Sequence, residues 1–296
     1  MDKLFRSLMF VPAHNKRFMD KAQEIDADVL LFDIEDSVQP HSNKQIARDN
    51  IIKYVSEGKF KGRTVFPRVN DRESGDLLKD LYQLTIEGVN GFMYPKAMKG
   101  EDIYFVGKLL ETIEYEKGFP ISTFKLIPLI ETTGAVMNLS EICSACPNRV
   151  VGIAFGCEDY MTDLKGMHDI QGNSIYVARS MIAIAARSAG IIPIDTVHIR
   201  VHDLEDLERN LNISKQLGYE GMLVLNPKEL PLVHQYYSPS PEQVDWAKEM
   251  LVLAEEAVKE GKGVAVKDNK FIGPPMIKMA KDIIHKQELI ERKKGV

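Results

Sequence analysis

The chain has 296 residues, of which 44% are hydrophobic, so it is long enough to bury one large core or two smaller ones. Its formal net charge is −5 and no long basic stripe is present, which argues against nucleic-acid and anionic-membrane partners. No apolar run approaches the roughly 20 residues that a membrane span needs, and the start "MDKLFRSLMFVPAHN" lacks the uninterrupted apolar region of a signal peptide. We therefore expect a cytoplasmic protein.

Short apolar runs alternate with longer amphipathic stretches along most of the chain. Eight runs rich in Val, Ile, Leu and Phe are predicted to be strands: 7–13, 28–35, 64–70, 91–97, 124–131, 150–159, 192–199 and 221–227. No two-residue hairpin turn separates neighbouring runs, so the strands should be parallel and joined by crossover helices. Eight such units favour a (β/α)8 TIM barrel, which typically takes about 250 residues.

Two of the connecting stretches have clear helix ends. The stretch 174–190 is amphipathic, and Gly190 suits the C-cap of its helix. The stretch 203–218 has Asp203 as a plausible N-cap and Gly218 as its stop. An open, doubly wound sheet is the competing fold, but it usually carries a glycine-rich turn after its first strand, and "VPAHNKR" has none.

The chain beyond the eighth strand is predicted to be a separate extension. "SPSPEQ" marks a break, 244–263 is predicted to be a helix, and a short hairpin with Asp268-Asn269 at its turn precedes a final helix. We therefore predict a barrel domain at 1–237 and a C-terminal helical and hairpin extension at 238–296. The extension is too small to fold alone, so we expect it to pack on the barrel or on a neighbouring subunit.

Charged side chains follow several of the predicted strands. Barrel enzymes carry their chemistry at the C-terminal ends of strands. The charged and polar residues at these ends are Asp33, Glu35, Asp36, Arg68, Asn70, Lys96, Glu131, Glu158, Asp159, Asp195, His198 and Arg200. Carboxylates gathered in a low-dielectric mouth repel one another and take up protons unless a cation neutralises them.

A magnesium ion would neutralise such a group. Mg²⁺ takes oxygen ligands and typically accepts one or two protein carboxylates while it keeps positions for water and substrate. Glu131 and Asp159 end the fifth and sixth predicted strands, which are neighbours in a barrel, so their carboxylates can converge on one ion. Arg68 can reach a substrate carboxylate or an oxygen that develops negative charge. Glu158 has an alternative role as a helix cap.

Six segments of the chain, taken in order, resemble the motifs of one family. They are "RSLMFVPAHN", "DVLLFDIEDSV", "RVN", "PLIETTGAV", "FGCEDYMTDL" and "ARSMIAIAARSAGIIPIDTV". Each fragment alone is degenerate, but the whole set in this order is specific. On these motifs the chain resembles the citrate lyase β-subunit family, the CoA-thioester branch of the HpcH/HpaI aldolases, over most of the barrel.

The resemblance implies a Mg²⁺-dependent carbon–carbon lyase. Its expected substrate is a 3-hydroxyacyl thioester such as malyl-, citramalyl- or citryl-CoA, cleaved by a retro-Claisen or aldol-type reaction. The resemblance implies Glu131 and Asp159 as metal ligands, and Arg68 and Glu131 as catalytic and substrate-binding residues. Family precedent favours a homotrimer or hexamer that binds a small oxoacid or an acyl-CoA.

Further substrate contacts are expected at the same rim. Asp33, Glu35 and Asp36 are candidates for binding the substrate, although they could instead pair with nearby lysines and arginines. Lys16 and Arg17 follow the first strand and could contact CoA phosphates, although an ordinary exposed basic pair is an equal alternative.

Three positions near the C-terminus depart from the family pattern. Met222 stands where the family usually has a lysine, and Asn226 stands where it usually has a histidine. Gly273 replaces a tail aspartate that acts as an acid/base across a subunit interface, and a glycine cannot transfer a proton. Met222 also weakens the expectation of CoA itself. Two alternatives therefore stay open: a metal-dependent aldolase on free 2-oxo acids without CoA, and a non-catalytic metal- and oxoacid-binding subunit.

Overall fold

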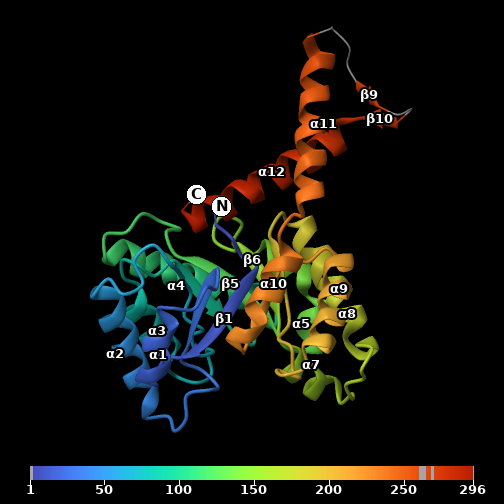
Figure 1. Ribbon diagram of the computed structural model, residues 1–296. Helices are drawn as coiled ribbons and strands as arrows, with labels where there is room; N and C mark the ends of the chain where they lie inside the picture. The colour runs from blue at the N-terminus through green and yellow to red at the C-terminus, as the bar shows by residue number, and fades with distance from the viewer. Residues whose placement is uncertain (1–2, 260–264, 268–269, 296) are drawn as a thin grey trace. The chain divides into compact units, whose positions relative to one another are not determined.

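The computed structural model describes residues 3–259, 265–267 and 270–295 (Figure 1). Its contacts divide the chain into two compact units, Phe5–Val233 and a second unit of His234–Val296 with Met1–Leu4. Within the described residues, no helix is both long enough and apolar enough to cross a membrane.

The first unit is built on one sheet of eight parallel strands. The strands are β1 (Ser7–Pro12), β2 (Val29–Asp33), β3 (Thr64–Val65), β4 (Gly91–Tyr94), β5 (Lys125–Ile130), β6 (Gly152–Phe155), β7 (Ile192–Asp195) and β8 (Gly221–Val224). Their order is β3-β2-β1-β8-β7-β6-β5-β4. A parallel bridge between Arg68 and Met93, with a 2.9 Å hydrogen bond from the Met93 amide to the Pro67 carbonyl, closes the gap between β3 and β4. The predicted (β/α)8 barrel is confirmed.

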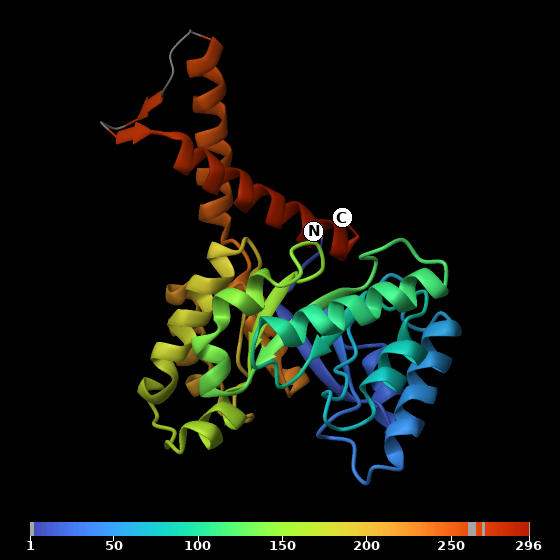
Figure 2. The ribbon, with the colours of Figure 1, turned by 180° about the vertical axis from the view of Figure 1, so that it is seen from behind.

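Helices surround these strands on the outside (Figures 1 and 2). They are α1 (Lys16–Ala22), α2 (Asn43–Ser56), α3 (Leu77–Leu84), α4 (Gly100–Glu116), α5 (Thr133–Met137), α6 (Leu139–Ser144), α7 (Cys157–Leu164), α8 (Asn173–Ser188) and α9 (Leu204–Leu217), and β8 leads into η1 (Pro227–Glu229) and α10 (Leu230–Tyr237). The predicted ends of α9 are confirmed: the Asp203 side chain accepts the Asp206 amide, and Gly218 takes φ +88°.

All eight strands are shorter than the predicted ranges, and the third and sixth differ in ways that affect the site. The third strand was expected over 64–70 but ends at Val65, since Pro67 has no amide to donate and Arg68 makes only isolated bridges. The expectation that the sixth strand extends through Asp159 is wrong, because α7 begins at Cys157. Its first turn holds Glu158 and Asp159, where the helix dipole favours negative charge.

Alternating side chains of the strands fill the inside of the barrel. One buried cluster joins residues from every strand region: Phe5, Leu8, Val29, Leu31, Phe66, Met93, Ile127, Leu129, Ala154, Ile194 and Leu223. Side chains two residues apart on a strand point to the same face. The next inward positions beyond Leu31, Phe66 and Leu129 are therefore Asp33, Arg68 and Glu131, so the fold itself directs these charges into the C-terminal mouth.

The second unit consists of two helices and a hairpin. Its elements are α11 (Pro241–Lys259), β9 (Ala265–Lys267), β10 (Lys270–Ile272) and α12 (Pro274–Lys294). The two strands pair antiparallel, and a small core forms around Ala247, Met250, Ile272 and Ala280. The expected turn at Asp268-Asn269 and the end of the helix expected over 244–263 lie outside the described residues.

A buried ion pair holds the N-terminal ends of β5 and β6. Glu114 of α4 is fully buried, and its carboxylate accepts hydrogen bonds from Nη1 and Nη2 of Arg149, both at 2.8 Å. The same carboxylate accepts the amides of Ser122 and Phe124 at 3.0 and 2.8 Å. Every oxygen of Glu114 is thus used, and its removal would leave the Arg149 charge buried without a partner.

We expect Glu114→Ala to lower the free energy of unfolding by about 3–5 kcal/mol, the range observed when one member of a buried ion pair is removed. Urea denaturation followed by circular dichroism measures the change. Glu111→Ala on the same helix is the matched control, since Glu111 pairs with Lys108 on the surface, where ion pairs contribute little. Equal midpoints for the two variants would contradict a structural role for the buried pair.

Candidate active site

Arg68 lies at the centre of the charged mouth of the barrel. Its guanidinium donates to Asp33 through two bonds, Nε to Oδ1 at 2.8 Å and Nη2 to Oδ2 at 2.7 Å. Its third nitrogen lies 3.1 Å from Oε2 of Glu35, and the guanidinium also stacks over the Phe10 ring at 4.9 Å. Burial opposes the charge of Arg68, but these carboxylates outweigh that effect and raise its pKa. Arg68 therefore stays charged and rigidly oriented.

Asp33 and Glu35 respond differently to this arginine. Burial alone would raise the pKa of Asp33, but the two bonds from Arg68 more than offset burial and keep the pKa low. Burial raises the pKa of Glu35 to about 7, although Arg68 and Lys96 oppose the rise. Glu35 can thus exchange a proton near neutral pH, whereas Asp33 is a fixed negative charge.

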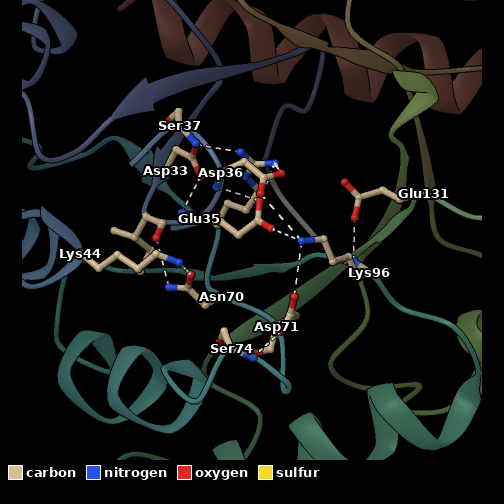
Figure 3. A network of polar contacts seen from close by, with 12 residues as sticks. Asp33, Glu35, Asp36, Ser37, Lys44, Asn70, Asp71, Ser74, Lys96 and Glu131 are labelled. Carbon is tan, nitrogen blue, oxygen red and sulfur yellow. Dashed lines mark hydrogen bonds and ion pairs between the residues drawn. The ribbon is translucent and has the colours of Figure 1, made fainter. Parts of the chain in front are cut away.

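Lys96 connects the two halves of the site (Figure 3). Its Nζ lies 2.8 Å from Oε1 of Glu35, 3.4 Å from Asp71 and 3.8 Å from Asp36. Its backbone amide donates to Oε2 of Glu131 at 2.6 Å. Lys96 has φ +52°, a left-handed conformation that is rare outside glycine and marks local backbone strain. This conformation lets one residue serve Glu35 with its side chain and Glu131 with its backbone.

Glu131 is a buried carboxylate that forms no ion pair with the described lysines, arginines and histidines. Burial raises its pKa to about 8, and the charges of Glu35 and Asp159 add to the rise, whereas the Lys96 amide and Arg68 oppose it. A Cβ atom added at Gly156 would lie 2.6 Å from Cγ of Glu131. The glycine therefore leaves the space in which the Glu131 side chain lies.

The two acids in the first turn of α7 have different surroundings. Glu158 lies on the surface and pairs with His168, Oε1 to Nε2 at 2.8 Å. Cys157, Glu158 and His168 form a group with ligand atoms within 4.8 Å. Burial raises the pKa of the Cys157 thiol to about 12, so the sulfur is protonated. Asp159 instead interacts electrostatically with Glu131.

A neighbouring aspartate fixes the loop after Glu131. Oδ2 of Asp163 accepts the amide and the hydroxyl of Thr133 at 2.7 and 2.6 Å. This contact joins α7 to the start of α5, the two helices that follow Asp159 and Glu131 along the chain. The relative position of the two acids is thus set by protein contacts.

The structure brings most of the expected site residues together. Asp33, Glu35, Arg68 and Glu131 share one network, and Asp36 joins it from a half-exposed position, with Oδ2 3.9 Å from Arg68. Lys16 and Arg17 lie on the exposed start of α1, and no described contact joins them to the network.

Sequence analysis assigned no role to Lys96 or Asp71, both of which belong to the network. The signal for Lys96 was its position after a buried strand, but the pattern does not show its positive φ.

The donors at Glu131 and Asp159 fit a hard divalent cation. Both are carboxylates, the ligands that Mg²⁺ prefers. Burial raises the pKa of Glu131, and the charges of Glu35 and Asp159 add to the rise. A cation held by Glu131 and Asp159 would favour the charged form of Glu131.

Comparisons with known proteins identify a family and several relatives of this chain. The family model described as HpcH/HpaI aldolase/citrate lyase matches residues 6–227. The citrate lyase subunit beta of Haemophilus influenzae is 31% identical over 284 residues, which cover 96% of this chain and 97% of that protein. A (3S)-malyl-CoA thioesterase of Cereibacter sphaeroides is 26% identical over 286 residues, which cover 97% of this chain and 95% of that protein.

Solved structures are also similar. The citrate lyase beta subunit of M. tuberculosis, complexed with oxaloacetate and magnesium, is 25% identical with a TM-score of 0.65, over 80% of this chain and 99% of that chain. A citrate lyase of Burkholderia xenovorans has a TM-score of 0.77 at 17% identity, over 98% of this chain and 91% of that chain, which shows the shared fold. With the family model matched across the whole barrel, the chain belongs to the HpcH/HpaI aldolase/citrate lyase family.

Proposed function

We propose that this protein is a Mg²⁺-dependent carbon–carbon lyase that cleaves a 3-hydroxyacyl thioester of the malyl, citramalyl or citryl type. The observation that carries the proposal is the buried Glu131 carboxylate, whose pKa is raised by burial and which interacts electrostatically with Asp159, beside an arginine held in place by Asp33. The citrate lyase and malyl-CoA thioesterase relatives, and the related structure with oxaloacetate and magnesium, support the substrate class.

Glu131 and Asp159 would hold the magnesium ion. When bound, Mg²⁺ would act as a Lewis acid. It would polarise the hydroxyl oxygen on the carbon whose bond is cleaved, and it would neutralise nearby carboxylates. Glu131 is oriented for this role by the Lys96 amide, and Asp163 fixes the loop that follows it. Protein contacts thus position Glu131 independently of the ion.

Arg68 would bind the anionic part of the substrate and stabilise the charge that develops on cleavage. Its side chain is 12% exposed, so it is not fully enclosed by protein. Because Asp33 holds the guanidinium in place, little reorganisation is needed as charge moves onto an oxygen. We assign Asp33 the role of orienting Arg68 in place of a direct substrate contact.

Cleavage requires a proton to leave the substrate hydroxyl while the carbon–carbon electron pair moves onto the thioester fragment as an enolate. The enolate carbon then takes up a proton. Glu35, with a pKa of about 7, is the rim carboxyl that we propose for proton exchange. Gly273 is the N-cap of α12 and has no side chain to transfer a proton; its backbone carbonyl accepts the Met276 and Ile277 amides.

We propose Lys16 and Arg17 as contacts for the carrier end of the substrate. Lys16 and Arg17 lie exposed at the start of α1, where they could attract CoA phosphates. We also propose a cytoplasmic homo-oligomer whose barrel domain spans 1–237. The extension at 238–296 would then pack on the barrel or on a neighbouring subunit.

A second candidate follows from Gly273. Without an acid at this position, the chain could bind metal and oxoacid without turnover, as a regulatory subunit. Incubation with Mg²⁺ and malyl-, citramalyl- and citryl-CoA, with free oxaloacetate and pyruvate in parallel, separates the possibilities. Cleavage of a thioester supports the lyase, and decarboxylation of free oxaloacetate alone, to pyruvate and CO2, supports a CoA-independent enzyme on free 2-oxo acids. Ligand-dependent thermal stabilisation without any product supports the binding subunit.

Arg68→Lys should lower kcat by about 10²–10³-fold, the cost of losing one preorganised donor at a developing oxyanion. Lysine keeps the charge but cannot make the forked pair with Asp33. Steady-state kinetics on the cleaved thioester measures the loss. Arg187→Lys is the control, since Arg187 pairs with Glu220 on the surface, and comparable losses in both variants would exclude a site-specific role.

Glu131→Gln and Asp159→Asn should each weaken Mg²⁺ binding by more than about 10-fold, because loss of even a supporting group around a metal costs about 10–100-fold. Isothermal titration calorimetry with Mg²⁺ measures the affinity. Glu158→Gln, one residue from Asp159 and paired with His168, should change it much less. If Glu158→Gln weakens binding as strongly as Asp159→Asn, our choice between these acids is wrong.

Gly156→Ala should weaken Mg²⁺ binding by about 10–100-fold without unfolding the barrel, because the new methyl group would displace the Glu131 side chain. Gly134→Ala is the control, since its Cβ would meet the flexible end of Met98 at 3.3 Å and Oγ1 of Thr132 at an ordinary contact distance of 4.0 Å. Metal titration and thermal unfolding are measured together. An unchanged affinity in Gly156→Ala would show that the ion does not depend on the position of Glu131.

A further inference from the structure

A histidine and two carboxylates are buried together under the loop between β7 and α9, residues 196–203. Nε2 of His198 lies 3.0 Å from Oδ2 of Asp206, and Nδ1 lies 3.6 Å from Oε1 of Glu229. His198 is 4% exposed and Glu229 is 0% exposed. The reaction proposed above uses none of these three residues.

Glu229 is the unusual member of this group. Among the described residues, neither of its carboxylate oxygens has a hydrogen-bond partner, and Nδ1 of His198 has none either. A buried carboxylate without a donor or a counter-charge is costly. A neutral imidazole carries one proton, so if it donates to Asp206 from Nε2, its Nδ1 presents a lone pair to Glu229. Only the doubly protonated imidazolium faces both carboxylates with an N–H group.

The remaining charges around the cluster make Glu229 depend on this proton. Asp206 has further cations, with Arg209 at 2.7 Å and Arg200 at 3.8 Å, and Asn210 lies 3.5 Å from Oδ2. Among the described residues, no cation other than His198 pairs with Glu229. Burial opposes protonation of His198, but Glu229 and Asp206 outweigh burial and raise its pKa above the usual value.

The cluster ties two segments at the mouth of the barrel. His198 belongs to the loop 196–203, whereas Glu229 ends the turn η1 that follows β8. A second tie runs from Nδ2 of Asn226 to the carbonyl of Val201 at 3.0 Å. The same loop lines an open cavity of about 760 Å³ with Ile199–Glu205. The position of the loop therefore sets the shape of this cavity.

We propose that protonated His198 is a positioning residue that pins the loop 196–203 to the turn η1, and that loss of its proton releases the loop. The pinning is fully present below the ordinary histidine range, where the imidazole is charged in any state. It is lost as the pH rises through the raised pKa of His198 in the folded protein. The loop is thus fixed below the raised pKa of His198 and freed above it.

The decisive measurement is the titration of the histidine rings by nitrogen–proton correlation spectra of the full chain. The His198 signal, identified as the one missing in His198→Asn, should show an imidazolium that loses its proton only above the ordinary histidine range. Glu229→Gln keeps the size of the side chain and removes its charge, so it should lower the proton affinity of His198 by about tenfold or more. A neutral His198 throughout, or an unchanged titration in Glu229→Gln, would overturn the proposal.

Hydrogen exchange tests the release of the loop itself. Protection factors at 196–203 should fall with pH along the His198 titration in the wild type, and they should be low at every pH in His198→Asn. His202→Asn removes an exposed imidazole from the same loop and should leave the wild-type dependence in place. Protection that does not follow pH would overturn the proposal.

A kinetic consequence rests on the proposed function. If the loop helps to bind the thioester, KM should rise with pH along the His198 titration while kcat does not follow it. The split should vanish in Glu229→Gln. Because spectra and exchange need no turnover, a protein without lyase activity would still confirm or overturn the positioning role.

Discussion

The ion pair between Arg68 and Asp33 is the interaction on which the barrel mouth depends. Strand alternation sends several charged side chains to one place, where burial penalises every charge without a partner. Arg68 neutralises Asp33 and shares Glu35 with Lys96. These pairs occupy Arg68 and Lys96, and among the described residues Glu131 has a hydrogen bond from the Lys96 amide and a longer-range interaction with Arg68, but no ion pair of its own. The need for a cation at Glu131 thus follows from the way in which Arg68 and Lys96 pair with the other carboxylates of the site.

Buried carboxylates have different surroundings at the two ends of the barrel. At the N-terminal end, the carboxylates of Glu114 and Asp28 are matched by Arg149 and Arg6 with short, two-fold contacts. At the C-terminal end, the pKa of Glu35 and the pKa of Glu131 are raised toward neutrality. One end is therefore built for stability, and the other retains groups that can exchange protons or bind a cation, as barrel enzymes generally do.

The sequence pattern predicts the barrel because parallel strands buried on both sides leave strong apolar runs. It also places Arg68 and Glu131 correctly, since strand ends and alternation locate a side chain without knowledge of its neighbours. It fails where a position depends on local backbone geometry or on distant contacts. The helical start that carries Asp159, the positive φ of Lys96 and the burial of His198 beside Glu229 leave no periodic signal.

Closure of the barrel and assembly of the site share one residue. Arg68 bridges Asp33 on one side and Met93 on the other, so its backbone joins β2 to β4 across the short β3. Arg68, whose guanidinium lies in the site, therefore also makes the bridge that closes the barrel between β3 and β4. If the seam between Arg68 and Met93 were open, Arg68 would keep its pairing with Asp33 but would be separated from Glu131, which follows β5 on the other side of the seam. Binding of an anionic ligand at Arg68 would then report completion of folding as well as chemistry.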